Sequence, residues 1–72
     1  MQVTITLQID EELCGTDTLN GEIHLTGEEG LAPVCDALDN FVGHVRVHGM
    51  PAVSFTLRAP DGAMVGFIRV EK

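Results

Sequence analysis

The chain has 72 residues, four basic against eleven acidic side chains, and a formal net charge of −7. This length predicts one domain, residues 1–72, with a small core, because such a chain buries only about 60% of its unfolded surface. The acidic balance argues against nucleic acid and anionic membrane as direct partners. No apolar run approaches the roughly 18 residues of a membrane span. We expect a cytoplasmic protein, because the first residues lack the basic region of a signal peptide.

The first third of the chain has the patterns of strands. Residues 2–9 alternate apolar and polar side chains, which predicts a half-buried strand. Asn20-Gly21 is a strong signal for a two-residue hairpin turn, and residues 22–26 alternate again. Residues 16–19 are ambiguous and could pair with that strand. The side chains expected to face inward are Val3, Ile5, Leu7, Ile9, Ile23 and Leu25.

One helix follows these strands. Thr26-x-x-Glu29 has the form of a capping box that would start a helix at Gly27. Pro33 argues against that start, because an interior proline breaks a helical hydrogen bond. We therefore expect a helix from Pro33 to Val42, ended by Gly43. Its apolar stripe would consist of Val34, Cys35, Leu38, Phe41 and Val42.

The last third predicts three strands, at residues 44–48, 52–58 and 63–71, separated by turns at Gly49-Met50-Pro51 and Ala59-Pro60-Asp61-Gly62. Together the elements predict an α+β fold. We expect a four- to five-stranded, mostly antiparallel sheet with one helix packed on one face, in the order β-β-α-β-β-β. In length and element order this layout resembles the β-grasp, ubiquitin-like folds. The tail, Arg69 to Lys72, lacks the Gly-Gly end of a conjugated modifier.

Charge is distributed unevenly along the chain. Residues 1–42 hold nine of the eleven acidic residues and no lysine or arginine. A block of this kind destabilises the fold by self-repulsion, which favours a role in binding over a role in folding. A solvated face that keeps the protein soluble is the alternative interpretation. The expected partner contacts are Glu11, Glu12, Asp17, Glu28, Glu29, Asp36 and Asp39.

The predicted sheet leaves a mildly basic outer face. With the inward assignments above, that face would carry His24, His44, Arg46, His48, Arg58 and Arg69. The hypothesis that this face binds RNA has little support, because Phe67 is the only residue there that could stack on a base. The last strand has apolar side chains on both faces, so either a partner covers one face or a bulge at Gly66 returns Phe67 to the core. The possible dimer or partner patch is Val65, Phe67, Arg46, Arg58 and Arg69.

Catalytic and metal chemistry have little support. The chain has one serine, Ser54, in mid-strand, and no phosphate-binding, zinc or calcium motif. We expect no enzyme activity, catalytic residue, cofactor or metal site. Cys14 and Cys35 are either two free thiols or a disulfide. His44 and His48 have H-x₃-H spacing, but a strand would hold them roughly 13 Å apart at about 3.3 Å per residue.

These features favour a non-enzymatic inhibitor that occupies a basic, nucleic-acid-binding surface of a larger protein or complex. In size and charge the chain is similar to phage anti-CRISPR and anti-restriction proteins, a viral class of acidic nucleic-acid mimics. The alternative is a homodimeric structural or accessory module that associates through the last strand and the open sheet face. A third hypothesis is that His24, His44 and His48 bind a small ligand or a metal.

Overall fold

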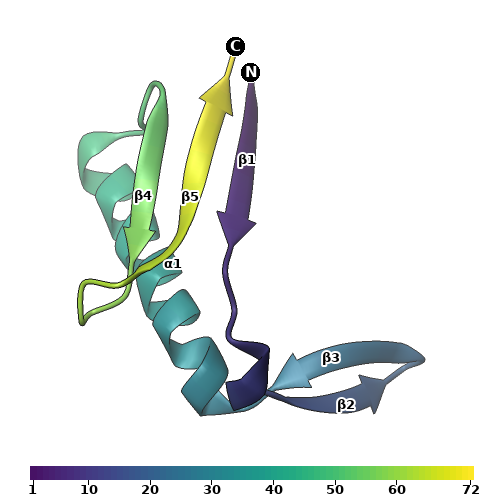
Figure 1. Cartoon of the computed structure of the whole chain (residues 1–72). Helices are drawn as coiled ribbons and strands as arrows, with labels where there is room; N and C mark the ends of the chain where they lie inside the picture. The colour runs from purple at the N-terminus through teal and green to yellow at the C-terminus, as the bar shows by residue number, and fades with distance from the viewer.

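Three antiparallel strands form the main sheet, in the order β1-β5-β4 (Figure 1). In this computed structural model, which describes residues 1–72, the strands are β1 (Gln2–Leu7), β4 (Ser54–Arg58) and β5 (Met64–Glu71). The last strand of the chain therefore lies in the centre of the sheet, between the other two. A single helix packs against this sheet, so the predicted α+β class is confirmed. The molecule has five strands in all, which are divided between two separate sheets.

The second sheet is a hairpin of β2 (Gly15–Leu19) and β3 (Glu22–Thr26). It projects away from the body of the molecule, like the short arm of an L (Figure 1). Asn20 and Gly21 have φ values of 53° and 81°, as the two central residues of a type I′ turn require. The hairpin predicted from Asn20-Gly21 is confirmed, and the ambiguous residues 16–19 belong to its first strand.

The helix, α1, runs from Glu28 to His48 and is twice the predicted length. The expected strand at residues 44–48 is therefore wrong, because these residues form the C-terminal end of the helix. Gly43 stays helical, and the helix ends at Gly49, which has φ 86° and donates its N–H to the carbonyl of Val45. Pro33 did not prevent the early start, because packing of the helix against the sheet outweighs the cost of an interior proline, about 3 kcal/mol. No helix combines the length and the apolarity that a membrane span requires.

The core lies between α1 and strands β4 and β5. Its largest fully buried side chains are Leu57 and Ile68, which pack with Val34, Ala37 and Phe41 of the helix. The helix leans toward β4, since the ring of Phe55 contacts both Phe41 and His44 at centroid distances of 5.1 and 4.9 Å. The outer strand β1 is left without a covering helix.

Several predicted core residues are therefore exposed. The helix covers one face of the main sheet over β4 and β5 but does not extend over β1. The β1 side chains on that face, Val3, Ile5 and Leu7, are therefore 36–48% exposed. Only Ile9 packs against the core. Ile23 and Leu25 are 78% and 40% exposed, because the hairpin projects away from the body. Cys35 is also exposed, which corrects its place on the buried stripe.

The central strand β5 contains an irregularity that decides which of its residues are buried. Leu57 of β4 pairs with Gly66, whereas Arg58 pairs with Met64, so Val65 is an extra residue at this point. Val65 and Gly66 are consequently both buried. A bulge beside Gly66 was one of the two predicted outcomes, but it returns Val65 rather than Phe67 to the core. Phe67 remains 41% exposed on the open face.

Candidate functional site

Four of the seven predicted contact residues, Glu11, Glu12, Glu28 and Glu29, gather at one end of the molecule. Asp10 precedes a short 3₁₀ helix, η1 (Glu11–Leu13), and its Oδ1 accepts a hydrogen bond from the backbone N–H of Glu12 at 3.1 Å. η1 packs against the start of α1, where a Cβ on Gly30 would lie 3.1 Å from the backbone of Leu13. This close approach places Asp10, Glu11 and Glu12 beside Glu28 and Glu29, which occupy the first turn of α1.

Asp61 joins this group from the β4–β5 turn. Its Oδ1 accepts a hydrogen bond from the backbone N–H of Ala63 at 2.9 Å, which holds the turn. The sequence indicated only a turn at this position, and nothing in it showed that the turn faces η1. We call the resulting surface the acidic end, which consists of Asp10, Glu11, Glu12, Glu28, Glu29 and Asp61.

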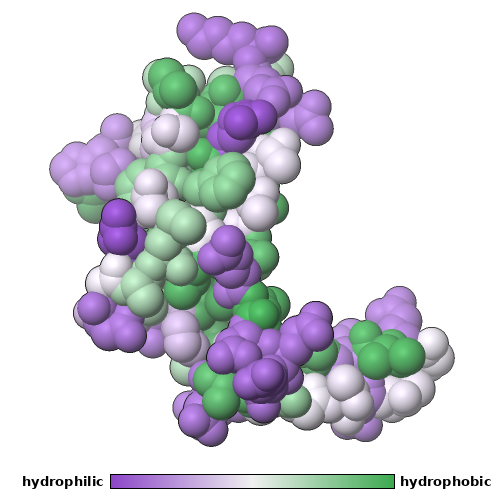
Figure 2. All heavy atoms as spheres, in the orientation of Figure 1, coloured by the Kyte–Doolittle hydropathy of each residue, from purple (hydrophilic) through white to green (hydrophobic).

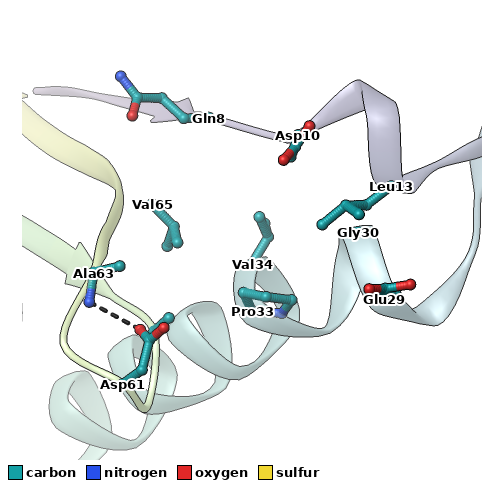
Figure 3. Close-up of a pocket in the computed structure, with 11 residues that line it drawn as sticks. Gln8, Asp10, Leu13, Glu29, Gly30, Pro33, Val34, Asp61, Ala63 and Val65 are labelled. Atoms are coloured by element: carbon teal, nitrogen blue, oxygen red, sulfur yellow. Dashed lines mark hydrogen bonds between the residues drawn. The ribbon is translucent and has the colours of Figure 1, made fainter.

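A pocket of about 200 Å³ opens within the acidic end. Gln8 and Asp10 line one side, Leu13 and Glu29 another, and Asp61 and Ala63 lie across from them (Figure 3). Val34 and Val65 point into the pocket and, with Pro33, supply an apolar floor. Three carboxylates from three separate elements therefore surround one apolar depression. Its volume is below the roughly 300–1,000 Å³ of typical small-molecule sites and is closer to the scale of one side chain.

No cation neutralises the acidic end. The structure contains two side-chain ion pairs, Glu22–His24 at 3.5 Å and Arg69–Glu71 at 3.9 Å, and neither involves this surface. Arg58 is the basic residue of the adjacent turn, but its Nη1 donates to the carbonyl of Gly62 at 3.0 Å. Figure 2 shows hydrophilic side chains gathered at the lower end of the body, where the hairpin leaves it.

Two other parts of the predicted acidic site lie elsewhere. Asp17 is on the hairpin, where it pairs with His24 in the register of β2 and β3. Asp36 and Asp39 are exposed on α1. Asp36, the nearer of the two, lies about 12 Å along the helix axis from Glu28, at a rise of about 1.5 Å per residue. The structure does not bring these three carboxylates into the acidic end.

The expected basic sheet face does not form. His44, Arg46 and His48 lie on the last turns of α1, because residues 44–48 are helical. His24 lies on the hairpin, so only Arg58 and Arg69 belong to the main sheet. These basic side chains are thus distributed over four elements, β3, α1, β4 and β5.

The predicted dimer or partner patch is also divided. Val65 is buried in the core, and Arg46 is on the helix rather than the sheet. Phe67 and Arg69 remain exposed on the open face of β5. Because β5 is the central strand, its two backbone edges are already paired with β1 and β4. A second copy therefore cannot add to the sheet through the last strand.

The helix changes the geometry of two histidines. His44 and His48 are one turn apart, with ring centroids 4.9 Å from each other instead of the separation that a strand would impose. His24, on the hairpin, is not part of this pair. No group of three or more His, Cys, Asp or Glu side chains in residues 1–72 is placed to hold a metal ion. Cys14 and Cys35 are free thiols.

Comparison of the chain with protein-family models, with curated proteins and with solved structures gave no match. The functional argument therefore depends on the geometry of the chain itself.

Proposed function

We propose that this chain is a small non-enzymatic binding protein that docks its acidic end on a basic, nucleic-acid-binding surface of a larger protein. By occupying that surface it would compete with nucleic acid and act as an inhibitor, in the manner of anti-CRISPR or anti-restriction proteins. The free state of both thiols fits a reducing cytoplasm, where this proposal places the protein.

The pocket of the acidic end is the observation that carries the proposal. An apolar floor surrounded by Asp10, Glu29 and Asp61 suits the side chain of a lysine or arginine, whose stem is apolar and whose end is charged. The surrounding carboxylates have no cation of their own, so a basic partner surface would supply the missing charge. Long-range attraction between such surfaces accelerates association and disfavours acidic partners.

Preference for acidic residues at helix starts explains part of this arrangement. Glu28 and Glu29 stabilise the first turn of α1 through the helix dipole. That effect does not explain Asp61, which comes from a turn 32 residues further along the chain than Glu29. Its presence at the same pocket favours a surface that recognises a partner.

A pair of matched variants tests the proposal. The first is Asp10→Asn, Glu29→Gln and Asp61→Asn together, which removes three pocket charges and keeps the cap and the turn, because asparagine can serve both. The control is Asp17→Asn, Asp36→Asn and Asp39→Asn, which removes the same charge outside the acidic end. The immobilised chain is used to capture proteins from a nuclease-treated bacterial lysate. The captured protein is then purified and titrated with each variant.

We expect the captured protein to be basic and to be released by duplex DNA or RNA. The pocket variant should bind it at least tenfold more weakly, about 1.4 kcal/mol, with a shallower dependence on salt. The control variant should bind within about twofold of the wild-type chain. Equal weakening by both variants, or release by salt but not by nucleic acid, would contradict the proposal.

A further inference from the structure

The outer edge of β1 presents unpaired backbone groups. The N–H of Gln8 donates to the carbonyl of Val65 in β5 at 2.7 Å, which continues the pairing of β1 with β5. Because successive residues of a strand direct their N–H and C=O groups to opposite sides, the even-numbered residues of β1 bond to β5. The groups of Val3, Ile5 and Leu7 therefore point outward, away from the sheet.

The two edges of the main sheet differ in how they are protected. β4 ends in Arg58 at the β-bulge and is followed closely by Pro60, and charge, bulges and proline all discourage strand addition. β1 has none of these features, since residues 2–9 contain no charge and no proline. This edge is therefore open and uncharged, although the whole chain carries a net charge of −7.

The side chains of β1 add an apolar row to this open edge. Val3, Ile5 and Leu7 are 36%, 48% and 37% exposed on the face that the helix covers over the neighbouring strands. In the register of the sheet they lie beside Val70, Ile68 and Gly66 of β5. A strand that pairs with β1 and has apolar side chains on the same face would extend the apolar row and remove Val3, Ile5 and Leu7 from water.

We propose that a second copy of this chain occupies this edge, with the two β1 strands antiparallel and Ile5 on the two-fold axis. Outward-facing backbone groups must meet outward-facing groups, so Ile5 pairs with Ile5 of the second copy and Val3 with Leu7. This register uses the whole strand and forms about six backbone hydrogen bonds. It also places both helices on the same face of one continuous sheet.

Charge complementarity supports a second copy as the occupant. β1 begins beside the end of β5, where Arg69 and Lys72 (+2) outnumber Glu71 (−1), the ion-pair partner of Arg69, and leave a side-chain charge of +1. At its other end β1 leads to Asp10, Glu11 and Glu12, which carry −3 (Figure 1). Antiparallel pairing reverses one copy relative to the other. Each end that carries Arg69 and Lys72 therefore lies beside the acidic η1 of the second copy, whereas a parallel arrangement would bring the acidic segments together.

Two isoleucine-to-lysine variants test this proposal, with the oligomeric state measured by sedimentation velocity. Ile5→Lys places a charge on the proposed axis, and Ile23→Lys makes the same change on the hairpin, where the isoleucine is also exposed. We expect the wild-type chain and the Ile23→Lys variant to sediment as dimers, with a mass twice the 7.7 kDa of one chain. The Ile5 variant should sediment as a monomer with an unchanged circular dichroism spectrum.

Cross-linking tests the register, in a Cys14→Ala and Cys35→Ala background that is checked for folding. Cβ atoms of directly opposed residues lie about 4.5–5.5 Å apart, near the range for a disulfide. Ile5→Cys should therefore give a covalent dimer under mild oxidation, and Val3→Cys, displaced from the axis, should not.

A wild-type monomer at about 0.5 mM, well above the micromolar range of ordinary association, would overturn the proposal. Equal cross-linking at positions 3 and 5 would also overturn it. These measurements contain no partner protein, so their outcome is independent of the function proposed for the acidic end.

Discussion

Gly66 is the residue at which the sheet tolerates no side chain. It lies in the central strand between Leu7 and Leu57, and a Cβ there would overlap the carbonyl oxygen of Thr6. The neighbouring backbone belongs to a paired strand and cannot move without breaking the β1–β5 ladder. Gly43, in the helix, has open space around it and an ordinary helical backbone.

Alanine substitutions at these two glycines should therefore have opposite effects. Gly66→Ala should destabilise the protein by about 1–3 kcal/mol, the typical effect of overpacking. Gly43→Ala should stabilise it by about 1 kcal/mol, because alanine favours the helix more than glycine does. Chemical denaturation followed by circular dichroism measures both changes. A neutral Gly66→Ala variant would show that the sheet has room for a methyl group at this position.

At the level of elements, α1 contains an internal proline in its second turn. Pro33 is the sixth residue of the helix and cannot donate to the carbonyl of Glu29. An interior proline costs about 3 kcal/mol, offset by about 1 kcal/mol through its restriction of the unfolded chain. Pro33 also lines the pocket of the acidic end, which gives it a packing role beside its effect on the helix.

Pro33→Ala should raise the free energy of unfolding by about 2 kcal/mol, which corresponds to a rise in Tm of about 8–16 °C for a domain of this size. Pro60→Ala, in the β4–β5 turn, is the matched control. It should lower stability by up to about 1 kcal/mol, because proline presets the backbone of that turn. Thermal unfolding measures both. A lower Tm for Pro33→Ala would mean that its packing outweighs the missing hydrogen bond.

For the whole molecule, the acidic end is a concentration of like charge without cations. The fold brings Asp10, Glu29 and Asp61, which are far apart in the sequence, to one pocket, so we expect them to repel one another more than in the unfolded chain. This repulsion should make the stability of the protein depend on salt.

We expect Tm to rise between about 0.01 M and about 0.1 M NaCl, as the Debye length falls from about 30 Å to about 10 Å. The Asp10→Asn, Glu29→Gln and Asp61→Asn variant should show a smaller rise than the Asp17→Asn, Asp36→Asn and Asp39→Asn variant. Both have lost three charges, so a difference between them reports position rather than net charge. Identical salt dependence would show that the acidic end is too widely spaced to repel.

The sequence alone determined the features that depend on adjacent residues. The Asn20-Gly21 turn followed from its need for positive φ, and the strand near the N-terminus followed from its alternation. The single helix, the α+β class and the acidic character of the first half were predicted in the same way. Each of these properties is local, so neighbouring residues are sufficient to specify it.

Only the tertiary structure decided which surfaces are buried and which charges meet. Val45 lies two residues before Val47 and four after Phe41, so it fits both a strand and a helix, and packing of α1 on the sheet selected the helix. The same packing left β1 uncovered and brought Asp61 to the pocket beside Asp10 and Glu29. Burial and charge clustering depend on contacts between residues far apart in the chain, which local patterns do not specify.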